Sequence, residues 1–248
     1  MGQDLIYGIP MDTTKEITAA YVGIGNELLS GSTQDENFLY LARCLHELGI
    51  QLMRCFVIPD EQDVIRETIE RCRGRFTYVF TSGGLGPTHD DVTVEGVALA
   101  LGVPVVRHPF LEKKIREFYG DSLEEASLKM AEVPQGAALH LPDRMSFPVL
   151  SIENIYLFPG IPELFQQKFE AIKERFRTRP YHTREILSDR RESEIADLLS
   201  EALERFPSIR IGSYPQWGEK GYRVKVVVEG KDEDSVAKAA AHLQKVLA

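Results

Sequence analysis

The sequence predicts an α/β protein: a three-layer sandwich around a mostly parallel sheet, followed by a small α+β domain. Three apolar runs each end in a glycine or proline turn and lead into a helical pattern, which is the succession that builds a parallel sheet with right-handed crossovers. The pattern then changes after the basic, proline-containing link Arg177–Pro180. We therefore expect one domain over residues 16–178 and a second over residues 181–248.

The first half of the chain supplies the parallel strands. After an irregular leader of about fifteen residues, each expected strand is rich in small or β-branched side chains, and glycines at 49 and 102 end two of the helices. Asp60 is interpreted as the cap of the second helix or as a ligand contact at a strand end. The expected strands are Ile17–Gly25, Ile50–Ile58 and Tyr78–Thr81, and the expected helices are Glu36–Leu48, one opening at Pro59–Glu61, and Val92–Leu101.

The second half adds elements that cover the sheet and then the small domain. Pro109–Phe118 and Leu123–Ala131 have the spacing of amphipathic helices, and short strands follow, the last at Asn154–Phe158. A helix is expected over Pro162–Phe176. Beyond the link, alternation of apolar and polar residues predicts an antiparallel sheet with one face in water. The small βαββα unit is expected as Thr183–Leu187, Glu192–Phe206, Ile209–Tyr214, Tyr222–Glu229 and Asp234–Leu247.

Composition and charge limit the classes of function. The chain has 248 residues, 43% of them hydrophobic, and a net charge of -9, which argues against general affinity for nucleic acid or anionic membrane. No run approaches a membrane span, and the N-terminus lacks the basic start and apolar core of a signal peptide. Cys44, Cys55 and Cys72 form no CxxC pair, so we expect buried free thiols and a cytoplasmic protein.

The stretch Thr81–Thr93, TSGGLGPTHDDVT, links the third strand to the next helix. Gly83, Gly84 and Gly86 allow a tight turn and a close approach of backbone N–H groups to a phosphate, and Thr88 adds a hydroxyl donor. A bulky residue at position 84 is then expected to abolish ligand binding and leave the fold intact. In a parallel sheet, ligands bind outside the carboxyl ends of the strands, where the turns GIGNE, VIPDE and SGGLGPTHDD all lie.

Acidic side chains gather at the same strand ends. Asp90 and Asp91 are adjacent, and such a pair repels unless a cation or hydrogen-bond donors compensate. Glu27 and Asp60 follow the two neighbouring strands, and carboxylate oxygens suit a hard divalent cation. We expect Asp90 to be the main metal ligand and Asp91 or Glu27 to be a second ligand or a base. One of these acids can equally be an ordinary helix cap.

Four segments in this order and spacing resemble a known family. GIGNELLSG followed by Asn37, then VIPDE, TSGGLGPTHDDVTVE and FPGIPEL are similar to the MoaB/MogA-like molybdopterin-binding domain of CinA proteins. YLFPGIPELF and GSYPQWGEKGYRVKV resemble, more closely, the version of this domain at the front of animal FAD synthases. The resemblance covers the chain from about Ile17 onward. It departs at Leu128–Ala131 and Asp143–Pro148, where the family has an Asn-rich helix and a GTAPG-like turn.

The resemblance implies either pterin binding or cleavage of the diphosphate in ADP-ribose or FAD with magnesium, manganese or cobalt, releasing AMP. A non-catalytic pterin or nucleotide module and an adaptor with a vestigial site are the alternatives. The chain lacks the adenylyl-transferring and deamidase domains of its relatives, so we expect neither of those activities. A homo-oligomer is expected because related domains assemble. The expected ligand-binding residues are Gly83, Gly84, Gly86, Thr88, Asn37, Asp60, Gly160 and Glu163, with Asp90 and Asp91 at the metal and Asp90, Asp91 and Glu27 in catalysis.

Overall fold

The computed structural model divides the chain into two compact units, Met1–Thr178 and Arg179–Ala248. The structure describes residues 5–6, 9–10, 16–141, 147–217 and 221–247. Part of the Asp143–Pro148 departure therefore lies outside the described residues. Near the start of the chain, β1 (Leu5–Ile6) pairs with β2 (Ile9–Pro10), where the sequence suggested an irregular leader.

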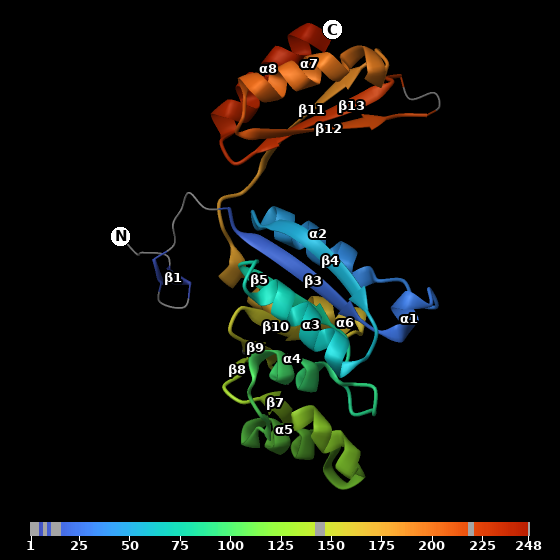
Figure 1. Ribbon diagram of the computed structural model, residues 1–248, viewed down its shortest axis with the longest axis vertical. Helices are drawn as coiled ribbons and strands as arrows, with labels where there is room; N and C mark the ends of the chain where they lie inside the picture. The colour runs from blue at the N-terminus through green and yellow to red at the C-terminus, as the bar shows by residue number, and fades with distance from the viewer. Residues whose placement is uncertain (1–4, 7–8, 11–15, 142–146, 218–220, 248) are drawn as a thin grey trace. The chain divides into compact units, whose positions relative to one another are not determined.

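A six-stranded sheet in the order β4-β3-β5-β10-β9-β8 forms the centre of the larger unit (Figure 1). The first four strands of this order are parallel, and β9 and β8 are each antiparallel to their inner neighbour. Every residue of β5 is buried, as expected for a parallel strand covered on both faces. The strands are β3 (Thr18–Ile24), β4 (Gln51–Ile58), β5 (Tyr78–Ser82), β8 (Ala138–His140), β9 (Val149–Ile152) and β10 (Ile155–Phe158).

Helices cover both faces of this sheet. On one face, α2 (Glu36–Glu47) and α6 (Pro162–Ile172), extended by the 3-10 turn η3 (Lys173–Phe176), pack on side chains of β3, β5 and β10. On the other face lie α3 (Gln62–Arg73) and α4 (Thr93–Leu101). The predicted three-layer α/β fold with a mostly parallel sheet is confirmed.

The two faces of the sheet have different cores. The α2 and α6 side is aromatic, and Phe169 and Phe176 stack with ring centroids 5.9 Å apart. The α3 and α4 side is aliphatic. There, a Cβ on Gly96 would lie 2.5 Å from the Ile65 side chain, so glycine permits the close contact of the two helices. The aromatic core fixes α2 and α6, whose N-termini lie next to the candidate site.

A smaller layer extends from the β8 side of the sheet. It contains α5 (Pro109–Tyr119) and a strand pair, β6 (Val105–Arg107) and β7 (Glu132–Pro134), which the sequence did not suggest. The helix expected over Leu123–Ala131 is instead a 3-10 turn, η2 (Glu125–Ala131), and a second 3-10 turn, η1 (Gly120–Ser122), lies just before this range. In a 3-10 turn, residues three apart lie in line, and Leu128 and Ala131 are thus buried together against α5.

The smaller unit is an antiparallel sheet in the order β11-β13-β12 with two helices on one face (Figure 1). Val224, Val226 and Val228 are buried under the helices, and the residues between them lie on the other face. The alternation read from the sequence is therefore explained by one-sided packing. The elements are β11 (His182–Ser188), α7 (Glu192–Arg205), β12 (Ile209–Pro215), β13 (Val224–Gly230) and α8 (Glu233–Leu247).

The cysteines only partly follow the expectation. All three are free, and Cys44 and Cys72 are buried, but Cys55 is exposed. The expectation for Cys55 is wrong because β4 is the edge strand of the sheet, where side chains in the middle of the strand remain in contact with water. Within the residues that the structure describes, no helix is long and apolar enough to cross a bilayer.

Candidate functional site

The carboxyl ends of four parallel strands meet at one edge of the sheet. Backbone hydrogen bonds join them in pairs: Gly25 N–H donates to the Ile58 carbonyl, and Gly83 N–H donates to the Phe158 carbonyl, both at 3.1 Å. The short helix α1 (Asn26–Leu29) begins directly after the first of these strands. The turns that follow β3, β4, β5 and β10 are therefore neighbours, as the sequence predicted.

We define the glycine loop as residues 83–91, between β5 and α4. Gly83 and Gly84 have φ values of +108° and +64°, which side-chain-bearing residues rarely adopt. A Cβ on Gly83 would lie 2.1 Å from the Ile24 carbonyl oxygen, and one on Gly84 would lie 2.3 Å from Thr93 Oγ1. The expectation that a bulky residue at 84 leaves the fold intact is therefore wrong, because its first contact is with the protein itself.

Several backbone donors of the loop are engaged inside the protein. Gly83 N–H bonds to the Phe158 carbonyl, and Gly86 N–H donates to Asp91 Oδ1 at 2.7 Å. Among the described residues, Gly84 N–H has no hydrogen-bond partner. Of the three amides predicted to face a phosphate, Gly84 is thus the one that the fold leaves available.

Asp91 organises the loop. Its carboxylate accepts hydrogen bonds from Gly86 N–H, from Thr88 N–H at 2.8 Å and from the Thr88 hydroxyl. From the sequence, a metal ion was expected to compensate the negative charge of Asp91. In the structure, these three hydrogen-bond donors compensate it. The Thr88 hydroxyl, predicted to hold phosphate, is directed to Asp91 in this structure.

Asp90 has different surroundings. Its side chain is 58% exposed, with His89 Nδ1 3.9 Å away. The neighbouring Thr88 side chain, then the Asp90 backbone N–H, lower the pKa of Asp90, and the charges of His89 and Lys129 add to this effect. Asp90 is therefore ionised at neutral pH and open to a ligand, whereas its neighbour Asp91 is engaged by the loop.

The other two acids lie on the turns after β3 and β4. Asp60 Oδ2 accepts a hydrogen bond from Asn26 N–H at 2.8 Å and so joins these turns. Its interpretation as a helix cap is wrong, since α3 begins after Glu61 and no side chain caps it. Glu27, in the first turn of α1, is exposed, with its carboxylate over Gly25. Among the described residues, no three acidic, histidine or cysteine side chains are grouped closely enough to hold a metal.

Asn37 lies beneath the site. It is 4% exposed, and its Nδ2 group donates to Ser82 Oγ at 2.9 Å and to the Gly160 carbonyl at 2.7 Å. A Cβ on Gly160 would lie 3.4 Å from Gly83 Cα, so these two turns pack directly together. Asn37 therefore fixes the turns after β5 and β10. Glu163 is exposed in the first turn of α6, as expected of a helix-start charge.

Asp35 is a residue that the sequence reasoning did not select. Its Oδ1 accepts hydrogen bonds from Phe38 N–H at 3.0 Å and from the hydroxyl of buried Tyr21 at 2.9 Å. Burial raises the pKa of Tyr21 strongly, so the phenol remains a donor. In the described part of the chain, the other oxygen of Asp35 and Oδ1 of Asn37 are buried without a partner. In the sequence, Asp35 lies directly before the helix that begins at Glu36, a position typical of an N-cap residue, and this pattern could have identified it.

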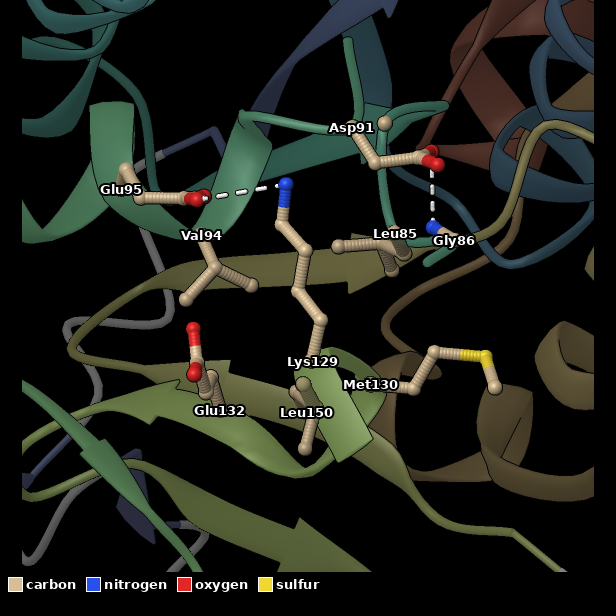
Figure 2. A pocket seen from close by; sticks show the side chains of 10 residues that line it. Leu85, Gly86, Asp91, Val94, Glu95, Lys129, Met130, Glu132 and Leu150 are labelled. Carbon is tan, nitrogen blue, oxygen red and sulfur yellow. Dashed lines mark hydrogen bonds and ion pairs between the residues drawn. The ribbon is translucent and has the colours of Figure 1, made fainter. Parts of the chain in front are cut away.

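A small hollow lies on one side of the glycine loop, with a volume of about 30 Å³ (Figure 2). That volume holds a water molecule and is far below the size of a nucleotide site. Lys129 reaches into it from η2, donating to the Thr88 carbonyl at 2.9 Å and pairing with Glu95 at 3.5 Å.

Comparisons with known proteins agree with this architecture. Residues 20–178 match a family described as a probable molybdopterin binding domain, and residues 180–248 match the middle domain of FAD synthase. A protein of Archaeoglobus fulgidus is 33% identical over 228 residues, covering 91% of this chain and 96% of its own.

Two further relatives carry descriptive names. A probable FAD synthase of Caenorhabditis elegans is 29% identical over 261 residues; the match covers 93% of this chain and 50% of the relative, so the chain spans half of that protein. The crystal structure of CinA from Thermoplasma acidophilum, a protein of unknown function, is 29% identical with a TM-score of 0.60, covering 65% of this chain and 98% of the other.

Proposed function

The chain belongs to the family of molybdopterin-binding domains, and from that premise we propose that it binds a phosphate-bearing nucleotide or pterin at the strand-end edge and hydrolyses the diphosphate of ADP-ribose or FAD to release AMP. Its larger unit is CinA-like, and the whole chain is related to FAD synthase. The observation that carries the proposal is that residues of the glycine loop have different surroundings. Asp91 accepts the hydrogen bonds that hold the loop, whereas Asp90 is exposed and ionised. Among the described residues, Gly84 N–H has no hydrogen-bond partner.

The acids at this edge suit a divalent cation that is bound together with the substrate. Magnesium is commonly held by one or two carboxylates plus substrate phosphates, with no dedicated protein cage. Asp90 would supply the protein ligand, and Glu27 would offer a second exposed carboxylate on the turn after β3. When bound, the cation would stabilise charge that develops on the diphosphate and lower the pKa of a bound water.

The remaining residues bind and position. Gly84 N–H would donate to a phosphate oxygen, and Gly83 and Gly160 pack directly together with no side chain between them. Because Asp91 is engaged by three donors, Glu27 is the stronger candidate for the base. Asn37 and Asp60 tie the turns together, so that these groups stay in fixed relation.

AMP release tests the proposal. The purified protein is incubated with ADP-ribose or FAD and with magnesium, manganese or cobalt, and we expect metal-dependent AMP. Asp90→Asn should remove most of the activity, and Asp121→Asn, at an exposed aspartate of η1, is the matched control that should keep it. Absence of AMP with every metal, or equal AMP from Asp90→Asn, would reject hydrolysis. Retention of the nucleotide or a pterin without turnover would then support a binding module.

A further inference from the structure

We propose that Lys129 is a positioning residue that fixes the glycine loop from the outside, so that Asp90 is presented to the ligand in one orientation. Lys129 lies in Leu128–Ala131, the segment where the sequence departs from the family pattern, and the proposed function assigns it no role. Its effect on turnover rests on that proposed function, whereas its effect on the loop does not.

The geometry places Thr88 between two anchors. Asp91 accepts the N–H and hydroxyl hydrogen bonds of Thr88 from within the loop. Lys129 Nζ holds the carbonyl of the same residue at 2.9 Å, from an element 41 residues away in sequence. Figure 2 shows the Lys129 side chain extending from η2 across the hollow toward the loop and α4. Fixing both sides of Thr88 sets the direction in which the chain continues to His89 and Asp90.

The charge of Lys129 is compensated on α4. Glu95 Oε1 lies 3.5 Å from Lys129 Nζ, and the two side chains are only 23% and 24% exposed. The other oxygen of Glu95 is buried and has no partner in the described part of the chain. Loss of Lys129 would therefore leave a largely buried carboxylate unpaired, which destabilises a fold for reasons unrelated to the loop. A useful test has to separate these two effects.

Paired substitutions separate them. Lys129→Met combined with Glu95→Gln removes both the Thr88 tether and the unpaired charge, and Glu95→Gln alone removes the charge but keeps the tether. Lys113→Met, at a lysine of α5 that is 75% exposed, is the control. The readouts are the thermal transition, amide hydrogen exchange in the loop by mass spectrometry, and AMP release.

We expect the double variant to unfold near the wild-type temperature, while loop peptides exchange about tenfold faster or more, because a hydrogen bond from a charged donor is lost. Glu95→Gln and Lys113→Met should keep the slow exchange. AMP release should fall at least about tenfold in the double variant, through kcat more than KM, because Asp90 is no longer held in its productive orientation.

Two results would overturn the inference: wild-type exchange of the loop in the double variant, or turnover in the double variant equal to that of the control. If the double variant does not fold, Lys129→Leu combined with Glu95→Gln carries the same expectations, because leucine also has no donor for the Thr88 carbonyl. If the wild-type protein releases no AMP, the proposed function fails, and loop exchange still decides the role of Lys129.

Discussion

Asp91→Asn is expected to loosen the larger unit, although the adjacent Asp90→Asn is not. The carboxylate of Asp91 uses both oxygens: Oδ1 binds Gly86 N–H, and Oδ2 binds the amide and hydroxyl of Thr88. A carboxamide has one accepting oxygen. Whichever way the substituted carboxamide is turned, its NH2 group would face an N–H donor, so either the Gly86 N–H bond or the Thr88 N–H bond would be lost, while the Thr88 hydroxyl can rotate to accept from the NH2 group.

The size of the effect follows from these contacts. A hydrogen bond to a charged group contributes about 1.5–3 kcal/mol, so losing one of them and the charge that strengthens the others should lower the free energy of unfolding by about 2–3 kcal/mol at this partly exposed site. For a unit of this size, that corresponds to a fall of about 4–12 °C in the melting temperature. The Asp90 side chain is 58% exposed, and surface substitutions of this kind change stability by only about 0.5 kcal/mol.

Thermal unfolding of the two variants beside the wild type, followed by circular dichroism at neutral pH, provides the measurement. Both variants should lose AMP release, but only Asp91→Asn should lower the transition of the larger unit. A wild-type melting temperature for Asp91→Asn would refute the assignment of Asp91 as the organiser of the loop. Equal destabilisation by the two substitutions would refute the conclusion that Asp91 holds the loop and Asp90 does not.

Three further predictions concern stability. Gly84→Ala places a Cβ 2.3 Å from Thr93 Oγ1 at a φ of +64°, so the urea midpoint should fall by the equivalent of about 1–3 kcal/mol, and an unchanged midpoint would show that the loop tolerates a side chain. Burial lowers the pKa of Lys168 from 10.5 to about 8, so between these pH values the unfolded state binds more protons than the folded state. As the pH rises across that range, the unfolding free energy of the wild type should therefore increase by up to about 3 kcal/mol relative to Lys168→Met. A difference in unfolding free energy that does not change with pH would contradict this prediction. Burial, then the charge of Arg175, lowers the pKa of His140 below 6.5. The unfolding free energy of the wild type relative to His140→Gln should therefore be greatest above pH 6.5 and decrease as the pH falls below that value. An unchanged difference in unfolding free energy at acidic pH would disprove this prediction.

Most of the larger fold could be predicted because its central strands are buried on both faces. Val79 and Phe80 lie in a continuous apolar run that ends in glycines, and such runs are typical of parallel strands. Convergence of the strand-end turns then follows from the topology alone. The 3-10 conformation of Glu125–Ala131 was not predictable, because it depends on how Leu128 packs against α5.

The roles of individual side chains were harder to predict, because hydrogen-bond partners are set by tertiary contacts. Asp60 looks like a helix cap in sequence, but it bonds to the turn after another strand. Asp90 and Asp91 are chemically identical neighbours whose surroundings differ only in the folded loop. Lys129 gives no local signal, since its contact with Thr88 spans 41 residues.

The central claim is that Asp90 binds a divalent cation together with the diphosphate at the strand-end edge. Calorimetric titration of ADP-ribose with and without manganese, on ice to slow turnover, tests it most directly when the wild type is compared with Asp90→Asn. We expect manganese to tighten binding to the wild type at least about tenfold, with little effect on the variant, whose fold is intact. Equal enhancement by manganese in both proteins, or no binding of ADP-ribose to the wild type under either condition, would contradict the claim.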